Sequence, residues 1–403
     1  MQESDEAARF EQVDWDEIGT RNRRLSSERA MLLAGLFVLF ALYLYDRFLA
    51  HVYFVGTIRM ETIDWVILLA AIIVLSYGMI PMRRNQKSVR RVLRELSAKP
   101  TALLAGGYLL ALFLIGALGP LFVSDPGLRF EQAFNPPIGV STQVTPFDCF
   151  GEVTGPPLDQ SCHGSLSYPL GTNERGHPLG FLLVSGARVA LYVTLFAAAF
   201  VIPLAATVGV IAGLYGGLLD DLLMGYVDIQ LSIPAIVLYF LGYAYWNPSL
   251  LLLLLTFGLL SWGGIARLVR SEVLQRREDG HVLVARSLGA SRLYIAKRHI
   301  LPNVTNTLVP AVFHLLAMLV LIEAGIAFLG FHELELYSWG STISESVNAA
   351  VPGYVQSRAD EPAYLIWWVS TLPALALTAT ILSFKLLGDS LRDALDPRHE
   401  GER

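Results

Sequence analysis

Two acidic side chains lie inside long apolar runs, where an ionisable group could bind a proton, an ion or a charged substrate. Asp228 lies in the run 222–245 and Glu323 lies in the run 304–328. A charged group is costly to place inside an apolar segment, so such residues often mark a transport pathway. For each side chain we expect a hydrogen bond between neighbouring helices. The alternative is that it faces the interior of the helix bundle, where partners or water offset the cost of burying the charge.

The other reactive residue types form no recognisable site. No spacing of His and Cys resembles a metal site, and His314 is expected to be a packed or hydrogen-bonded histidine. A phosphate-binding loop requires Gly followed by Lys. No lysine here follows a glycine; the lysines are Lys87, Lys99, Lys297 and Lys385. We therefore expect neither an enzyme nor a metal protein.

Composition indicates what must position these residues. Of 403 residues, 54% are hydrophobic and only 16% are charged, which favours an integral membrane protein. The first 30 residues are polar and show no cleavable signal pattern. Because a membrane-spanning helix needs about 20 apolar residues, the sequence predicts an all-α bundle of about eight transmembrane helices. They are expected at 31–49, 65–82, 102–123, 189–215, 222–245, 250–268, 304–328 and 364–387.

Basic residues predict the orientation of this bundle, because cytoplasmic loops carry an excess of Lys and Arg. With the N-terminus inside, 24 of the 30 Lys and Arg residues fall in cytoplasmic segments or at cytoplasmic helix ends. The other six are Arg47, Arg59, Arg129, Arg175, Arg188 and Arg358. Both termini are therefore predicted to be cytoplasmic. Small residues in the run 189–215 predict close helix packing, within the bundle or against a second membrane chain.

The outer segment 124–186 contains both cysteines, Cys149 and Cys162. An extracytoplasmic location is oxidising, so a disulfide between them is expected; the alternative is two unrelated cysteines. A second outer segment, 329–363, is acidic, and most of its carboxylates are expected to be solvated.

The stretch 276–302 is polar and basic, yet it lies between two apolar runs. Residues 281–288 could form one helical piece, and Gly289 would permit a turn that other residues disfavour. Ser291 could cap a second piece over 292–300, and Pro302 would end that piece before the next span.

Several motifs, in the same order along the chain, resemble the permease subunits of ABC importers for dipeptides and oligopeptides, specifically the C-type subunit. The loop pattern of that family is Glu-Ala-Ala, three residues, Gly, nine more, then Ile-x-Leu-Pro. Ala285, Gly289, Leu301 and Pro302 match it, whereas Leu283, Val284 and His299 depart from it. The other matching segments are 169–173, 186–188, 227–234, 327–330, 338–340 and 388–398.

The resemblance implies a type I ABC importer transmembrane fold in the C-terminal half. It also implies that the loop 276–302 inserts into a cleft on a separate ATPase subunit, through Ala285, Gly289, Ala290, Ser291, Leu301 and Pro302. The implied partners are a sister permease forming a heterodimer, two ATPase subunits, an extracytoplasmic substrate-binding protein and membrane lipid, without nucleic acid. ATP and Mg²⁺ would be used by the ATPase subunits, and this chain would hold no cofactor. The implied location is the plasma membrane of a prokaryote.

The resemblance divides the chain as follows. We expect a cytoplasmic segment at 1–30, three helices at 31–123, an extracytoplasmic segment at 124–186, the permease core at 187–390 and a cytoplasmic tail at 391–403. The family usually has one helix before the outer segment, so two of the three N-terminal helices are additions whose role the sequence does not indicate.

Two other functions are compatible with a membrane protein of this size: a secondary transporter and a membrane-embedded enzyme. A secondary transporter driven by an ion gradient predicts internal repeats and several intramembrane charges, and no second copy of the loop motif is present. A membrane-embedded enzyme requires a nucleophile–base pair or a metal cluster, and neither is found in the sequence. The importer is therefore favoured. Its substrate stays open between peptides and the nickel, glutathione or sugars carried by related permeases.

Overall fold

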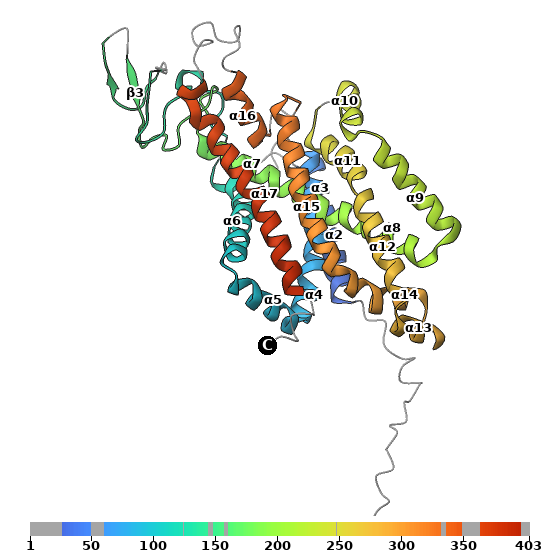
Figure 1. The fold of residues 1–403 in the computed structure, drawn as a ribbon. Helices are drawn as coiled ribbons and strands as arrows, with labels where there is room; N and C mark the ends of the chain where they lie inside the picture. The colour runs from blue at the N-terminus through green and yellow to red at the C-terminus, as the bar shows by residue number, and fades with distance from the viewer. Residues whose placement is uncertain are drawn as a thin grey trace, which may run out of the picture.

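The computed structural model of the protein describes residues 26–49, 60–123, 125–143, 148–156, 160–246, 248–331, 336–348 and 363–395. Apart from one small sheet, the described chain is helical, and its long helices run side by side (Figure 1). The predicted all-α bundle is therefore confirmed. Some predicted features lie outside the described residues: the two basic residues Arg59 and Arg358, and most of the two terminal segments, at 1–25 and 396–403.

Seven helical runs in the described residues are long and apolar enough to cross a membrane. Several combine an α-helix with a short π-helical turn. The runs are α2 (Ser27–Phe48); α3 (Thr62–Val74) continuing through a π turn (Leu75–Met79) into α4 (Ile80–Arg84); α6 (Pro100–Phe122); α7 (Leu179–Phe196) continuing through a π turn (Ala197–Val201) into α8 (Ile202–Tyr215); α11 (Leu250–Ser261) with α12 (Gly263–Arg276); α15 (Leu301–Phe328); and α17 (Trp367–Leu395), preceded by a 3₁₀ turn (Ala363–Ile366).

The predicted span 222–245 is broken in two. Helix α9 (Gly217–Ser232) and helix α10 (Ala235–Tyr245) meet at an angle of 72°. Pro234 lies at the break, and Ile233 before it has the extended backbone that a following proline favours. The sequence predicted one span here, which Pro234 could kink; Pro310, open to the same prediction, lies inside the continuous helix α15. Counting the bent pair as one span gives eight.

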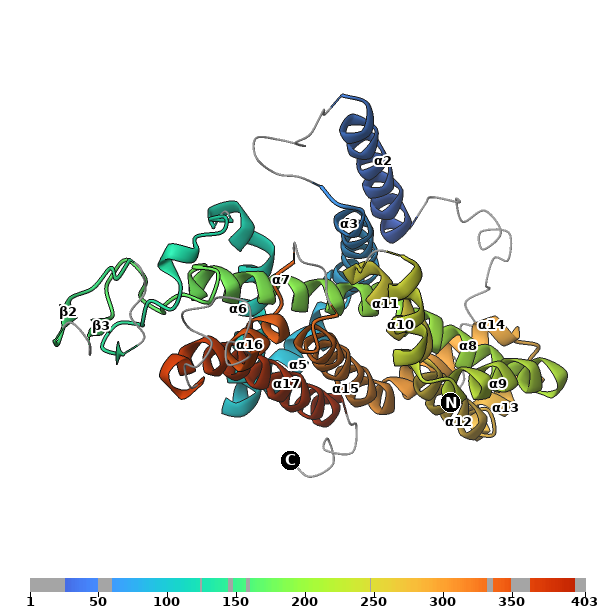
Figure 2. The same ribbon diagram turned by 90° about the horizontal axis from the view of Figure 1, so that it is seen from above.

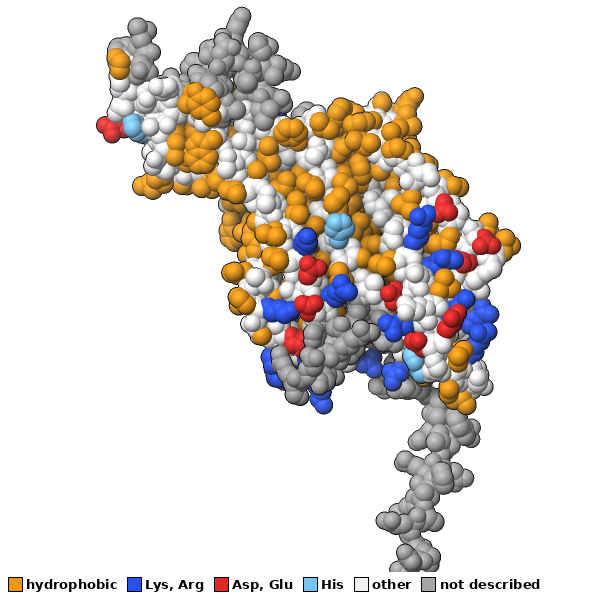
Figure 3. Space-filling model, viewed as in Figure 1, with side chains coloured by type: hydrophobic (Ala, Val, Ile, Leu, Met, Phe, Trp, Pro, Cys, Tyr) orange, Lys and Arg blue, Asp and Glu red, His pale blue; other side chains and the backbone are white. Residues whose placement is uncertain are grey.

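Short helices occupy the lower end of the bundle in Figure 1. They are α5 (Gln86–Ala98), α13 (Gly280–Ser287) and α14 (Arg292–Ile295), the last continuing through a π turn (Ala296–Ile300) into α15. The sequence predicted only a loop between the second and third spans, whereas the structure places α5 there. Charged side chains gather toward this end of the molecule, and hydrophobic side chains cover the middle and upper parts of the face in Figure 3.

Small residues bring α8 and α12 into close contact. A Cβ at Gly209 would lie 2.5 Å from the carbonyl oxygen of Ala266, and one at Gly213 would lie 2.7 Å from Val273. Neither position could carry a side chain without moving α12. The small residues predicted for this span therefore serve packing within the chain at these two positions.

The additional helix α3 is fastened to core helix α7 by a buried polar network. The guanidinium of Arg188 donates to the carboxylate of Asp64 at 2.8 Å and to the hydroxyl of Tyr192 at 2.8 Å. The Tyr192 hydroxyl also donates to Asp64. Helix α2 packs on α3 and stands outside the rest of the bundle (Figure 2). Apart from this contact, most of its large apolar side chains are exposed, and none of its residues is buried.

The end of the bundle opposite α5, α13 and α14 is predicted to be the outer end and is called so below (Figure 1). Helix α16 (Trp339–Asn348) interlocks this end by packing on α15, α17 and α7. The Trp339 indole donates to the carbonyl of Leu183 at 3.2 Å. A Cβ at Gly340 would lie only 1.8 Å from the backbone oxygen of Ala324. Beyond this end lies a lobe with a 3₁₀ turn (Phe130–Gln132) and an antiparallel sheet of order β1-β3-β2, made of β1 (Ser141–Thr142), β2 (Val153–Thr154) and β3 (Ser161–His163).

Candidate functional site

The loop 276–302 contains a tight helix-ending turn at Gly289. The φ of Gly289 is +84°, in the left-handed region that favours glycine. Its amide donates to the carbonyl of Arg286 at 3.0 Å, and the amide of Ala290 donates to the carbonyl of Ala285 at 3.1 Å. These two bonds form a Schellman motif, which satisfies the last carbonyls of α13. The spacing of Ala285 and Gly289 thus has a backbone cause.

The second helical piece begins where the sequence predicted. The amide of Tyr294 donates to the hydroxyl of Ser291 at 3.2 Å, so Ser291 caps α14. The end of that piece differs from the prediction. Pro302 lies in the first turn of α15, where its missing amide proton is harmless, and helical turns continue from α14 into α15. Pro302 therefore does not end the piece, and Leu301 is the first residue of the long helix.

Three contacts hold the loop against the bundle. The guanidinium of Arg292 lies 5.0 Å from the ring centre of Tyr215 at the end of α8, a cation–π distance. Arg277 donates to the carbonyl of Gly213 at 3.1 Å. Val282 is buried, and Ala285 and Ala290 pack against the hydrophobic core. The loop is therefore joined to α8 and α12, and a force on it would reach both helices.

The opposite side of the loop exposes large apolar side chains. Leu288, beside the turn, is 83% exposed, and the others are Leu283, Val284 and Tyr294. Nothing in the chain lies within 4 Å of the position that a Cβ would take at Gly289. The turn therefore presents an apolar surface next to an open space.

The structure adds a pair of histidines that the sequence did not single out together. The rings of His281 and His299 lie 5.7 Å apart, and Tyr294 packs against His299 at 6.0 Å. They join α13 to the π turn before α15. His299 stands where the family pattern has Ile, so an aromatic contact takes the place of an aliphatic one.

Asp228 joins two helices, which was the expected arrangement, and it does not face the bundle interior, which was the alternative. Its side chain is 62% exposed in this chain and forms an ion pair with Arg267 of α12. A second pair joins the same helices, because Arg270 binds both carboxylate oxygens of Asp220 at 2.5 and 2.6 Å. Asp228 therefore belongs to the α9–α12 contact.

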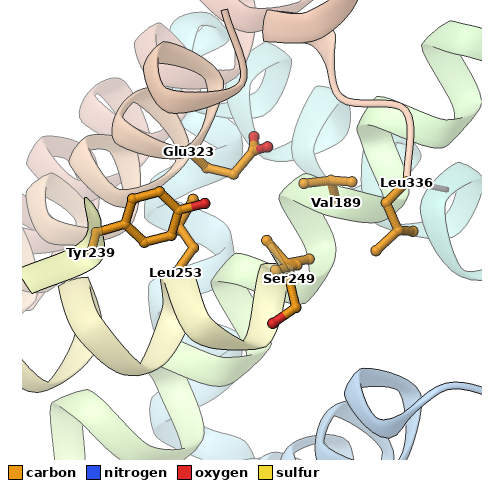
Figure 4. A pocket seen from close by; sticks show the side chains of 7 residues that line it. Val189, Tyr239, Ser249, Leu253, Glu323 and Leu336 are labelled. Carbon is orange, nitrogen blue, oxygen red and sulfur yellow. The ribbon is translucent and has the colours of Figure 1, made fainter. Parts of the chain in front are cut away.

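Glu323 is buried, with 7% of its surface exposed. It lines a small cavity in the bundle with residues of α7, α10 and α11 (Figure 4). The lining residues are Val189, Tyr239, Ser249, Leu250, Leu253, Glu323 and Leu336. Ser338, just before α16, lies near its carboxylate. The expected hydrogen bond between helices stays a prediction for Glu323.

The two cysteines form a disulfide in the outer lobe, and their Cα atoms lie 5.9 Å apart. Cys162 is fully buried in β3 and pairs in the sheet with Thr142 on one side and Val153 on the other. The bond therefore fastens the central strand to the loop that carries Cys149.

Sequence reasoning missed a polar cluster between the lobe and α16. Asn173 donates to Glu345 at 2.6 Å, and the guanidinium of Arg175 lies 3.7 Å from the same carboxylate. Burial raises the pKa of Glu345 to about 7. His177 is fully buried beside Tyr337, and burial lowers its pKa. The only sequence signal was the motif that contains Asn173; its partner lies 172 positions away.

No group of three or more His, Cys, Asp or Glu residues in the described part of the chain could hold a metal ion. The described residues therefore offer no centre for metal-assisted chemistry.

Comparison with known proteins gives the family. Residues 205–401 match the family model described as the binding-protein-dependent transport system inner membrane component. The dipeptide transport system permease protein DppC of Alkalihalophilus pseudofirmus is 31% identical over 58% of this chain and 73% of its own length. The oligopeptide transport system permease protein OppC of Haemophilus influenzae is 31% identical over 57% of this chain and 70% of its own length.

Among solved structures, an inward-facing conformation of the MetNI methionine ABC transporter matches with a TM-score of 0.43 and 21% identity, covering 55% of this chain and 99% of that one. The two permease relatives, each 31% identical and covered over more than two thirds of their length, show the family of this chain. The chain is a multi-pass membrane protein that belongs to the family of binding-protein-dependent transport system inner membrane components, beside the ABC permeases named for dipeptide and oligopeptide transport.

Proposed function

We propose that this chain is the C-type permease of an ATP-driven peptide importer and transmits ATP hydrolysis through the loop 276–302. The observation that carries this is the Gly289 turn, which is fastened to the bundle on one side and exposes apolar side chains on the other. Exposed apolar surface beside a tight turn supports docking into a partner. The partner is a separate ATPase subunit, because no lysine in this sequence follows a glycine.

The assembly follows from the relatives, whose names assign them to dipeptide and oligopeptide transport systems. In the proposed complex a sister permease provides the other half of the pore, two ATPase subunits bind inside, and a binding protein delivers the peptide outside. Residues 187–390 form the core of this half. Helices α9 and α10 support contact with the sister permease, since many of their apolar side chains are exposed in the described part of the chain; these include Leu218, Leu222, Ile229 and Tyr245.

The orientation belongs to the same proposal. The loop 276–302 and α5 lie at the end of the bundle where the basic residues gather, and this end is cytoplasmic by the positive-inside rule. The lobe with the disulfide is then extracytoplasmic. Both termini are cytoplasmic, in the plasma membrane of a prokaryote.

The test is Gly289→Trp in the complete complex. Since the space around a Cβ at this position is empty in the chain, the indole would obstruct only a docked partner. We expect peptide-stimulated ATP hydrolysis to fall by at least about tenfold, which corresponds to about 1.4 kcal/mol or more. Membrane insertion and the amount of folded protein should match those of a control variant.

The matched control is Gly139→Trp in the outer lobe. Gly139 also has a left-handed φ, +77°, and also has nothing within 4 Å of a Cβ. Both substitutions carry the same backbone strain, and only the position differs. Normal stimulated hydrolysis in Gly289→Trp, or equal loss in both variants, would contradict the proposed role of the loop.

A further inference from the structure

Helix α5 carries its apolar and basic side chains on opposite faces. The apolar residues recur at the spacing of a single helical face; they are Val89, Val92, Leu93 and Leu96. The basic residues lie on the other face; they are Lys87, Arg90, Arg91 and Arg94. This separation is the pattern of a helix that lies in a membrane surface rather than across the membrane.

The chain fixes the depth of α5. Its first residue follows α4 after Asn85, and its last is separated from α6 by Lys99 alone, so both ends join helical runs that can cross a membrane. Lys99 also forms an ion pair of 2.6 Å with Asp393 of α17. Figure 1 shows α5 at the foot of α6 and α17, at the same end as α13 and α14. The helix must therefore lie where the bilayer surface meets this end of the bundle.

The exposed parts of α5 fit that location. Leu93 is 58% exposed, and so is Met82 in the preceding α4. Lys87, Arg90 and Arg94 are exposed and form no ion pair within the described part of the chain. Glu95 lies on the helix itself, and Asp393 of the neighbouring helix α17 is engaged by Lys99. Three cations therefore remain for an outside anion.

We propose that α5 is an anionic-phospholipid binding surface, with Leu93 in the acyl region and Lys87, Arg90 and Arg94 at the headgroup phosphates. Clusters of Lys and Arg on an amphipathic helix next to a membrane span are attracted to anionic lipid, each contributing on the order of 1 kcal/mol, a factor of about five. The surface lies in the N-terminal part of the chain, before the residues that match the family model. The binding does not depend on the transported substrate.

Charge alone would also admit an occupant from the chain itself. The segment 1–17 carries Glu3, Asp5, Glu6, Glu11, Asp14, Asp16 and Glu17. An acidic segment, however, gives no reason for the apolar side chains beside the basic ones, whereas a bilayer surface accounts for both faces. Lipid is therefore the favoured occupant, and the acidic segment is one outcome of the test.

The test uses the full chain in nanodiscs of phosphatidylcholine with increasing phosphatidylglycerol. A nitroxide on Ser97→Cys, an exposed position near the end of α5, reports mobility and access to a water-soluble relaxation reagent. The cysteines of the outer lobe are already paired. We expect phosphatidylglycerol to slow the nitroxide, with reversal by added salt. In K87Q/R90Q/R94Q, the fraction of phosphatidylglycerol needed for half of the effect should rise by at least about tenfold.

Two controls separate charge from position. R90K/R94K keeps the charges and should respond as the parent does. R276Q/R286Q/R298Q removes three charges from the loop 276–302 and should leave the response unchanged. Equal mobility in both lipids, or an equal loss in both glutamine variants, would overturn the proposal. So would a slow nitroxide in phosphatidylcholine alone that becomes mobile when residues 1–25 are deleted, because the acidic segment would then be the occupant.

Discussion

The turns at Gly289 and Gly330 share one backbone geometry but differ in their surroundings. Their φ angles are +84° and +83°. At Gly330 the amide donates to Ala327 at 3.0 Å, and the next amide, of Phe331, donates to Ile326 at 3.2 Å, repeating the two bonds that end α13. Neither glycine has an atom within 4 Å of a Cβ position. Local sequence therefore produces the same turn after α13 and after α15.

Beyond the turns, the two ends diverge. Phe331 follows Gly330 and packs 4.6 Å from the ring of Phe240, and its carbonyl accepts from Tyr239 at 2.7 Å. At the inner turn the equivalent residue, Ala290, brings only a methyl group to the core. The residue before the inner turn, Leu288, is 83% exposed, and its equivalent before the outer turn, Leu329, is 57% exposed. The outer turn is therefore followed by aromatic contacts within the chain, whereas the inner turn has the smaller internal contact and the more exposed apolar side chain. A helix-ending motif identifies a turn, and the exposed apolar side chains beside it support the proposed docking site.

The largest expected effect tests how firmly the outer end is interlocked. Gly340→Val should lower the free energy of unfolding by at least about 3 kcal/mol, because its side chain would overlap the backbone of Ala324 in α15. The measurement is the yield of monodisperse protein and its thermal midpoint in detergent. Gly280→Val, at the open inner end, is the control, since nothing lies within 4 Å of its Cβ. Equal stability of the two variants would show that the outer end is not interlocked.

The second prediction removes the covalent part of the outer end. Replacing Cys149 and Cys162 with Ser should destabilise the lobe by roughly 3 kcal/mol in the chain-entropy model, since the bond spans 13 positions. Protease digestion at the lobe would report this, and mass spectrometry of non-reduced peptides should first show the cross-link. Reduction of the parent protein should reproduce the variant. Two free thiols in protein isolated under thiol-blocking conditions would remove the basis of the prediction.

Much of this comparison could be predicted from sequence, because its causes are local. Apolar runs of membrane-spanning length gave the bundle, and the spacing of Ala285, Gly289 and Ser291 gave the turn and the cap. A kink was expected to be possible at both Pro234 and Pro310, but the sequence did not indicate that only Pro234 would break its helix. Helix α5 was missed, although Val89, Val92, Leu93 and Leu96 have helical spacing, because its basic residues were used only for orientation.

Polar pairs between residues far apart in the chain could not be predicted from the sequence. Asp64 and Arg188 lie 124 positions apart, and Asn173 and Glu345 lie 172 apart. No periodicity indicates such partners, because each pair depends on how distant segments meet in the fold. Asp228 shows the same limit: a contact between helices was expected, but the sequence indicated neither its partner Arg267 nor the exposed position of the pair.

The third prediction uses the buried carboxylate at the outer end. Burial raises the pKa of Glu345 from 4.5 to about 7, so the folded state binds a proton that the unfolded state releases. This contribution to stability is therefore present below pH 4.5 and is lost as the pH rises toward 7. Glu345→Gln should flatten the curve and increase stability at pH 7 by roughly 1–3 kcal/mol. Thermal midpoints between pH 4.5 and 8 provide the measurement.

A separate group makes the control for this pH curve. Burial lowers the pKa of His177, so its contribution is lost as the pH falls below 6.5, in the opposite direction. His177→Phe, which keeps a ring beside Tyr337 and Phe181, should reduce the loss on the acid side and leave intact the fall that Glu345 contributes between pH 4.5 and 7. If Glu345→Gln leaves the slope between pH 4.5 and 7 unchanged, the carboxyl does not carry it.

The smallest expected effect returns to the two matched turns. Gly289→Ala and Gly330→Ala should each destabilise the chain by about 1 kcal/mol, because both place a Cβ in the left-handed region and neither meets a neighbour. Gly325→Ala, inside α15 and equally open, should instead stabilise by roughly 0.5–1 kcal/mol. Denaturant titrations in detergent measure all three. Equal costs at the two turns would show that their backbones are equivalent and that the loss of stimulated hydrolysis in Gly289→Trp reflects a partner. A cost at Gly289 well above that at Gly330 would mean that the inner turn is itself constrained within the chain, and the contrast between the two ends would no longer hold.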